Sequence, residues 1–95
     1  MAMTFEWDER KAHINLQRHQ INFEEAKTVF NDPFLMTFPD RDHSDGEYRY
    51  LSIGHAASGR TLVVIHTDRQ SAIRIISCRE AIRKEKKAYE EGDFS

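Results

Sequence analysis

The clearest structural signal in the chain is the stretch SAIRIISCREA, which runs from Ser71 to Ala81. Its β-branched residues predict a strand over 72–78, and the charged residues after it predict a helix. Arg74 alternates with apolar neighbours, so we expect it on the polar face of a half-buried strand. Arg79 follows at the predicted junction of strand and helix. Because a fixed guanidinium matches phosphate oxygens and never loses its charge, the stretch predicts a phosphate-binding edge.

The remainder of the chain predicts helices first and strands afterwards. Asp8 and Asn22 are suited to cap two helices, and after Asp32-Pro33 the spacing of apolar residues changes from a helical to a strand period. We therefore expect an α+β fold with the order β-α-α-β-β-β-β-α and an antiparallel sheet. The expected strands are 4–7, 34–38, 47–55, 61–67 and 72–78, and the expected helices are 9–19, 23–30 and 79–91.

Length and composition limit the possible class of protein. Ninety-five residues predict a single domain spanning 1–95, and one cysteine excludes an internal disulfide and favours a reducing compartment. The chain shows no signal-like opening and no apolar run of bilayer length, so we expect a cytoplasmic protein without a membrane partner. The expected aromatic anchors of the small core are Trp7, Phe23, Phe30, Phe34 and Phe38.

The charge is distributed unevenly along the sequence. The formal net charge is -2, and residues 1–59 contain ten acidic and six basic side chains. Residues 69–87 contain seven basic and two acidic side chains. A cationic surface on an acidic body still binds polyanions, although a lysine-rich helix is also an ordinary solvated surface.

Short motifs occur in a fixed order from about residue 5 to residue 91. They are Phe5-Glu6-Trp7-Asp8, Lys11, Asn15-Leu16, His19, Phe23 to Ala26, Val29-Phe30, Asp32-Pro33, Glu47, Arg49, Ile53-Gly54, Leu62 to Val64, His66-Thr67, Arg74 to Ser77, Arg79, Ala81, Glu85 and Tyr89-Glu90. In this order and spacing they resemble the BrnT family of toxins from type II toxin–antitoxin modules.

The resemblance implies a function as well as a fold. BrnT-like proteins are similar in fold to RelE-type toxins, which are small α+β ribonucleases. The resemblance implies an RNA-cleaving protein that arrests translation, and a BrnA-like antitoxin whose ribbon-helix-helix part binds promoter DNA. The toxin would reach that DNA only through the antitoxin. The acidic end at 89–93 departs from the longer basic C-terminal helix of many family members, which leaves the extent of the RNA surface open.

RNA cleavage without metal defines what the side chains must supply. The substrate's 2′-hydroxyl is the nucleophile, so the protein needs a base, an acid and fixed cations, and the product is a 2′,3′-cyclic phosphate. We expect no cofactor and no metal. Arg74 and Arg79 are the predicted cations. The alternative for Arg74 is a structural ion pair with Glu47 or Glu85, and a Glu85–Arg74 pair would orient the guanidinium.

Three further residues are candidates for catalysis. Lys11 lies near the start of the first predicted helix and suits a phosphate clamp or a proton donor, or pairs with Asp8 or Glu47. His66 ends a strand and titrates near neutrality, although a histidine held by a structural hydrogen bond is more common. Tyr89 is the least certain candidate, because a tyrosine on that helix stripe is more often part of the core edge.

The expected RNA-binding residues are Arg49, Arg83, Lys86 and Lys87. An acidic antitoxin segment is an equal alternative ligand for the helix side chains among them, and competition for one surface would explain inhibition. Residues 40–45 group aspartates with His43, but without a calcium-loop spacing, so we expect no metal there. The alternative function is a non-catalytic nucleic-acid or protein binding module.

Overall fold

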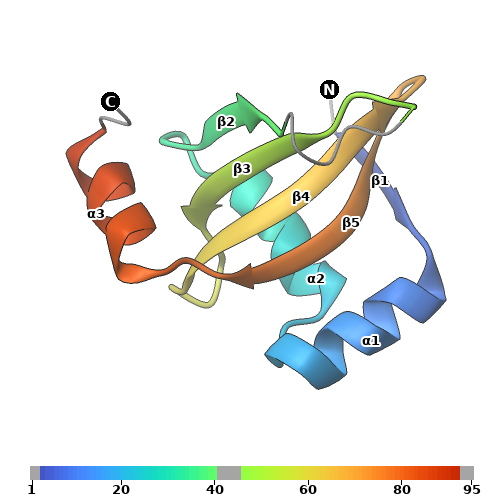
Figure 1. The fold of residues 1–95 in the computed structure, drawn as a ribbon, viewed down its shortest axis with the longest axis horizontal. Coiled ribbons are helices and arrows are strands. Elements are labelled where there is room, and N and C mark those ends of the chain that lie inside the picture. The colour runs from blue at the N-terminus through green and yellow to red at the C-terminus, as the bar shows by residue number, and fades with distance from the viewer. Residues whose placement is uncertain (1–2, 41–45, 93–95) are drawn as a thin grey trace.

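The computed structural model describes residues 3–40 and 46–92, and a five-stranded sheet with helices at its face and end makes up the fold (Figure 1). The α+β class and the predicted order of elements are confirmed, with a 3₁₀ helix added after the second helix. The elements are β1 (Thr4–Trp7), α1 (Glu9–His19), α2 (Phe23–Ala26), the 3₁₀ helix η1 (Lys27–Asn31), β2 (Met36–Pro39), β3 (Tyr50–His55), β4 (Thr61–Arg69), β5 (Ala72–Glu80) and α3 (Arg83–Glu91).

The strands lie in the order β1-β5-β4-β3-β2. The predicted antiparallel arrangement holds for β2 to β5, while β1 adds a parallel pair with β5 at the edge. A parallel pair needs a long connection between its strands, and the helices between β1 and the later strands provide one. The first strand of the chain is therefore beside the last.

The last strand is longer than the sequence predicted, and this moves Arg79. β5 continues through Glu80, which pairs with Leu62, and α3 begins only at Arg83. Arg79 therefore lies within a strand, and its predicted place at the start of a helix is wrong. Pairing with β4 holds this segment extended. Arg79 is therefore positioned by the sheet and not by the backbone amides at the start of α3.

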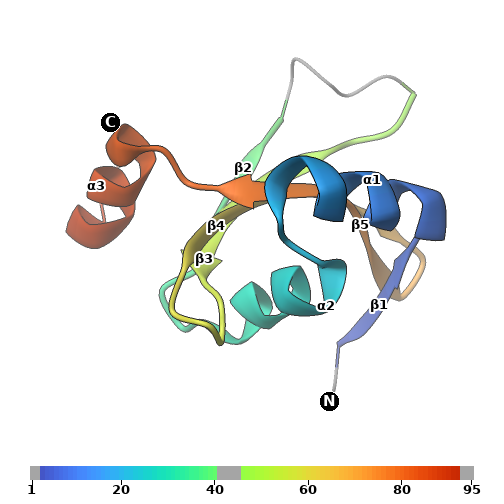
Figure 2. The same ribbon diagram turned by 90° about the horizontal axis from the view of Figure 1, so that it is seen from below.

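The main core lies between the sheet and the helices α2 and η1, which cover one face (Figure 2). Asp8 and Asn22 cap α1 and α2 as predicted, because their side chains accept hydrogen bonds from backbone amides of the first turn. Phe34 is 74% exposed, so its predicted role as a core anchor is wrong. The core is lined by Ile21, Phe23, Ala26, Val29, Leu62, Val64, Ile75 and Cys78.

The side chain of Asn15 joins α1 to the edge of β5. Pairing between β1 and β5 ends at Trp7 and Ile75, so the later part of β5 has no strand on that side. Asn15, which is 5% exposed, donates to the carbonyl oxygen of Cys78 at 2.9 Å and accepts from the Cys78 amide at 3.0 Å. Its amide nitrogen also donates to the carbonyl of Ile21 at 3.0 Å. The carboxamide thus takes the place of a neighbouring strand's peptide group.

A β-bulge at Ile76 changes which residues of β5 share a face. Ile65 pairs with Ser77 and His66 pairs with Ile75, so Ile76 has no partner in β4. The odd residues of β4 from 63 to 67 point to one face, and their partners are Arg79, Ser77 and Arg74. Strict alternation would have put Arg74 and Arg79 on opposite faces, because they are five residues apart. The bulge therefore brings both arginines to the face not covered by α2.

We predict that Asn15→Ala lowers the free energy of unfolding by roughly 3 kcal/mol, because it leaves buried peptide groups of Cys78 and Ile21 without partners. Urea denaturation of the variant should show a lower midpoint with an unchanged slope. Gln17→Ala, on the exposed side of the same helix, is the matched control and should change stability by less than about 0.5 kcal/mol. Equal stability of both variants would contradict this account of the β5 edge.

Candidate nucleic-acid interface

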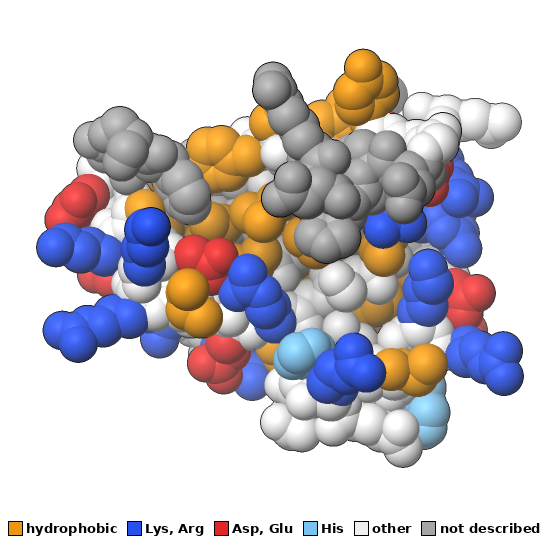
Figure 3. All heavy atoms as spheres, viewed as in Figure 1, with side chains coloured by type: hydrophobic (Ala, Val, Ile, Leu, Met, Phe, Trp, Pro, Cys, Tyr) orange, Lys and Arg blue, Asp and Glu red, His pale blue; other side chains and the backbone are white. Residues whose placement is uncertain are grey.

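The sheet face opposite α2 presents the predicted phosphate-binding residues together. Arg74, Ser77 and Arg79 lie along it on β5, and α3 packs over its far end through Ala81 and Tyr89. Lys and Arg side chains surround the middle of this face, where uncharged surface is exposed (Figure 3). The protein thus has a cationic sheet face, which we call the open face.

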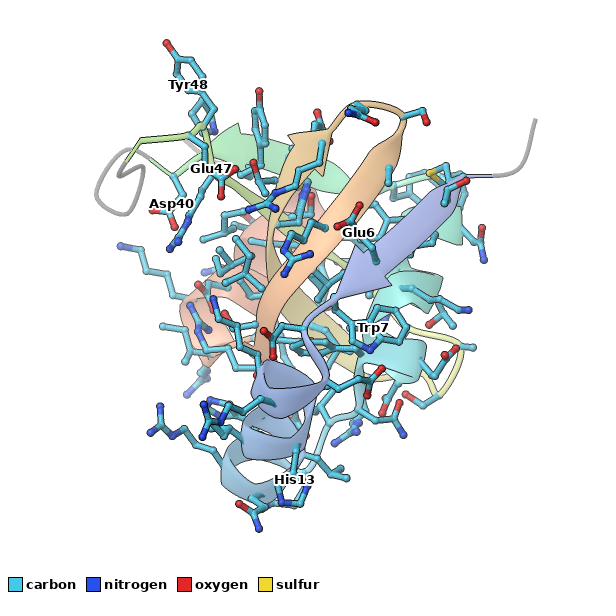
Figure 4. The ribbon with its side chains drawn as sticks, turned by 90° about the vertical axis from the view of Figure 1, so that its right-hand side faces the viewer. Glu6, Trp7, His13, Asp40, Glu47 and Tyr48 are labelled. Atoms are coloured by element: carbon cyan, nitrogen blue, oxygen red, sulfur yellow. The ribbon has the colours of Figure 1, made fainter. Side chains whose placement is uncertain are left out.

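Arg74 is held by a carboxylate from the neighbouring strand. Its Nη1 lies 2.7 Å from Oε2 of Glu6, and the two residues are paired in the register of β1 and β5. Glu6 extends from β1 on the open-face side (Figure 4). The side chains are 25% and 40% exposed, so the pair remains accessible to a ligand. The sequence reasoning considered Glu47 and Glu85 as partners of Arg74 and missed Glu6, whose place depends on the parallel pairing of β1.

Lys11 is near Arg74 through the start of α1. Asp8 caps this helix, and hydrogen bonds from the amides of Lys11 and Arg10 lower the pKa of its carboxyl group. The charges of Lys11 and Arg74 lower the same pKa further, so both cations act on one carboxylate. A helix on its own disfavours a lysine in its first turn. Lys11 is exposed and lines the cavity beside β5, so the structure leaves it available as a candidate for ligand binding.

Arg79 pairs with Glu85, the residue that the sequence suggested as a partner of Arg74. Two of its nitrogens donate to the two oxygens of Glu85 at 2.8 and 2.9 Å, and Glu85 also accepts from the Ile82 amide at 2.9 Å. The predicted Glu85–Arg74 pair is therefore wrong. The Glu85 bonds raise the pKa of Arg79, and the Arg79 bonds lower the pKa of Glu85. This bidentate pair fixes the first turn of α3 against β5.

A cavity of about 230 Å³ lies between α1 and β5. The bulge residue Ile76 and Ser77 form its strand side, and Asn15 lies at its base. Its charged rim contains Lys11 and Arg18. The cavity adjoins the part of β5 between the two arginines. An extended polyanion lying there would meet cations from two elements.

His66 is on the other side of the sheet. It is 5% exposed, and its Nε2 lies 2.7 Å from the hydroxyl of Ser52. Its ring packs against Phe30 and Tyr50, and burial lowers its pKa to about 4. The structure therefore does not bring His66 together with Arg74 and Arg79, and this position matches the structural alternative.

Tyr89 is also removed from the arginines. Its ring is 8% exposed and belongs to the small cluster under α3, and its hydroxyl donates to Asp32. Burial, together with the Asp32 carboxylate, raises the pKa of Tyr89 to about 12. Although burial opposes it, hydrogen bonds from Tyr89, His55 and Phe34 lower the pKa of Asp32. Tyr89 thus links α3 to Asp32, directly after η1, and to His55 at the end of β3.

The predicted RNA-binding residues lie at two places. Arg83, Lys86 and Lys87 are exposed on α3, and Arg49 is half-buried directly before β3. At the same end of β3, Tyr48 is 77% exposed and extends away from the sheet (Figure 4), an exposed aromatic that the sequence reasoning missed. Within 3–40 and 46–92 no group of acidic, histidine or cysteine side chains is arranged to hold a metal ion. Of the aspartate–histidine cluster at 40–45, Asp40 is described, and Asp42, His43 and Asp45 lie outside the described residues.

Comparison with known proteins decides the family. The family model described as "Ribonuclease toxin, BrnT, of type II toxin-antitoxin system" matches residues 7–85. The chain belongs to the BrnT family of ribonuclease toxins. The crystal structure of the Brucella abortus BrnT ribonuclease toxin matches with a TM-score of 0.67 and 25% identity, covering 86% of this chain and 100% of that one. The comparison with curated proteins gives no match.

Membership of the BrnT family confirms the resemblance seen in the sequence. It makes this chain a ribonuclease toxin of a type II toxin–antitoxin system, whose partner is an antitoxin. In the part of the chain that the structure describes, no helix is long and apolar enough to cross a membrane. The open face, with its two arginines, is the candidate RNA site of this BrnT-family protein.

We predict that buried His66 makes the fold sensitive to acid. Its folded-state pKa of about 4 lies below the usual value of 6.5, so the unfolded chain binds a proton first as the pH falls. The stability that depends on neutral His66 is complete above about pH 6.5 and falls by roughly 3 kcal/mol towards pH 4. Urea denaturation between pH 7 and 4.5 should show this loss, and His66→Gln should lack that part of the slope. Identical pH slopes for the two proteins would contradict it.

Proposed function

We propose that this chain is a metal-independent endoribonuclease that cleaves RNA on its open face and inhibits translation. The observation that carries the proposal is the bulge at Ile76, which aligns Arg74, Ser77 and Arg79 beside the cavity lined by Lys11. Family membership supports ribonuclease activity in general. We expect the protein to act in the cytoplasm, where translated RNA is found.

In the proposed reaction the substrate's 2′-oxygen attacks the neighbouring phosphorus. The bond from the 2′-oxygen to phosphorus forms, the bond from phosphorus to the 5′-oxygen breaks, and a 2′,3′-cyclic phosphate and a 5′-hydroxyl result. Arg74 stabilises the charge that develops on the phosphoryl oxygens, and Lys11 gives a proton to the departing 5′-oxygen. Arg79 supports the next phosphate. His66 and Tyr89 are not part of this proposal, because one lies on the other face and the other is bonded to Asp32.

We also propose that the antitoxin is a BrnA-like protein with a ribbon-helix-helix part, and that the toxin reaches promoter DNA only through it. An acidic antitoxin segment would cover the basic side of α3, where Arg83, Lys86 and Lys87 are exposed. These residues and Arg49 would otherwise contact the RNA backbone. Occupation of one cationic surface by either partner explains how binding of the antitoxin blocks cleavage.

The decisive assay incubates the purified protein with EDTA and RNA, both naked and in a translation extract, and analyses the ends of the products. We expect cleavage that is unaffected by EDTA and yields cyclic-phosphate ends. Arg74→Ala should lower kcat/KM by about 10²–10³-fold, because one charge contact to the transition state is lost. Lys27→Ala, which removes a cation paired with Glu24 on α2 at the covered face, is the control and should cleave normally. RNA binding without products would favour the non-catalytic alternative.

A second prediction concerns the antitoxin. Replacing Lys86 and Lys87 by glutamate should weaken binding of the proposed BrnA-like antitoxin, because like charges would then face each other. Isothermal titration at two salt concentrations should show the loss and a reduced salt dependence. Lys27→Glu, away from α3, should leave the affinity within twofold. Unchanged affinity of the Lys86 and Lys87 variant would place the antitoxin elsewhere.

A further inference from the structure

Glu6 lies on the open face and has no role in the reaction proposed above. It rises from β1 beside Arg74, and its side chain is 40% exposed. Within residues 3–40 and 46–92, Arg74 is the one recorded hydrogen-bond partner of this carboxylate, through Oε2 at 2.7 Å. A carboxylate that is both fixed by a phosphate-binding arginine and open to solvent is suited to accept a proton from the same ligand.

Three other carboxylates that the structure describes near this face have structural partners. Both oxygens of Glu85 accept from Arg79, one of them also accepts from the Ile82 amide, and the side chain is 16% exposed. Asp8 accepts two backbone amides as the cap of α1, and these bonds lower its pKa, which makes it a weak base. Glu47 lies at the same end of the sheet as Arg74, but its carboxylate pairs with Arg69 at 3.4 Å. Among these described carboxylates, Glu6 is the one that contacts Arg74, and that contact is its single hydrogen bond.

We propose that Glu6 is the general base that removes the proton from the attacking 2′-hydroxyl. This inference rests on the proposed ribonuclease function. A Glu6 oxygen takes the proton as the 2′-oxygen bonds to phosphorus, and the 5′-oxygen leaves with a proton from Lys11. Glu6 and Lys11 then exchange protons with water, so the enzyme is restored and no metal or other co-reactant is needed. Arg74 contacts both the base and the phosphoryl group and so fixes their relative position.

The charged groups that face Glu6 are consistent with this role. Arg74 on β5 contacts it, while Asp8 and Lys11 lie at the start of α1, directly after the strand that carries Glu6. Glu6 on β1 contacts Arg74, and Lys11 on α1 lines the cavity beside Ile76 and Ser77, so the two groups flank neighbouring parts of β5. That arrangement allows one group to act on the 2′-oxygen and the other on the 5′-oxygen of a single phosphodiester.

The test compares Glu6→Gln with the wild type on a fluorescent single-stranded RNA oligonucleotide of mixed sequence, naked and in a translation extract. Glutamine keeps an oxygen that Arg74 can bind but accepts no proton. We expect kcat to fall by about 10²–10³-fold while KM changes by less than threefold. The acidic limb of the wild-type pH–rate profile should disappear, and Glu6→Asp should restore part of kcat. Glu47→Gln, the matched control on the Arg69 pair, should leave cleavage unchanged.

The outcomes separate this inference from the proposed function. If Glu6→Gln cleaves as fast as the wild type, or changes KM alone, while Arg74→Ala is impaired, Glu6 is not the base and the ribonuclease proposal stands. If the wild type cleaves neither free RNA nor RNA in the extract, both proposals are overturned. Urea denaturation of each variant identifies loss of folding, and the pH profile distinguishes a base from a residue that only positions Arg74.

Discussion

The pairing of the Asn15 carboxamide with the backbone of Cys78 is the constraint on which the open face depends. β5 continues past the end of β1, and a sheet edge without a partner would leave buried peptide groups unsatisfied. A helix cannot offer its own backbone to a strand, but one side-chain amide offers both a donor and an acceptor at the right separation. By supplying it, Asn15 holds α1 against the edge of β5. Lys11 and Arg18, about two turns apart on that helix, line the cavity with Ser77.

The bulge at Ile76 and the side chain of Asn15 shape the same segment of β5. It lies in the segment where β5 loses β1 as a neighbour and gains α1 instead. The extra residue lets Ile75 and Cys78 both enter the core, although they are three apart, while Arg74, Ser77 and Arg79 share the opposite face. Packing of apolar residues on one side and alignment of cations on the other are therefore two results of the same irregularity.

The sequence predicted the elements well because they depend on local signals. Caps at Asp8 and Asn22 and the change of period after Asp32-Pro33 fixed the class and order. The partners of the arginines depend on contacts between distant residues, so local patterns could not provide them. Glu6 is 68 residues from Arg74, and only the parallel pairing of β1 brings them together. One local signal was available for the bulge, since two successive isoleucines at 75 and 76 interrupt the alternation.

The two arginines differ in how much of each remains for a ligand. Arg79 commits two nitrogens to Glu85 and donates to the Glu80 carbonyl, so its fork serves mainly to fasten α3. Arg74 gives Glu6 a single short bond from Nη1, which leaves other donors of its guanidinium for phosphate. A chain of net charge -2 thus presents positive charge on this face, because Glu6 and Glu85 are paired with the arginines that they orient. In the proposed function, a phosphate would meet positive charge already held in position, so little conformational entropy would be lost when it binds.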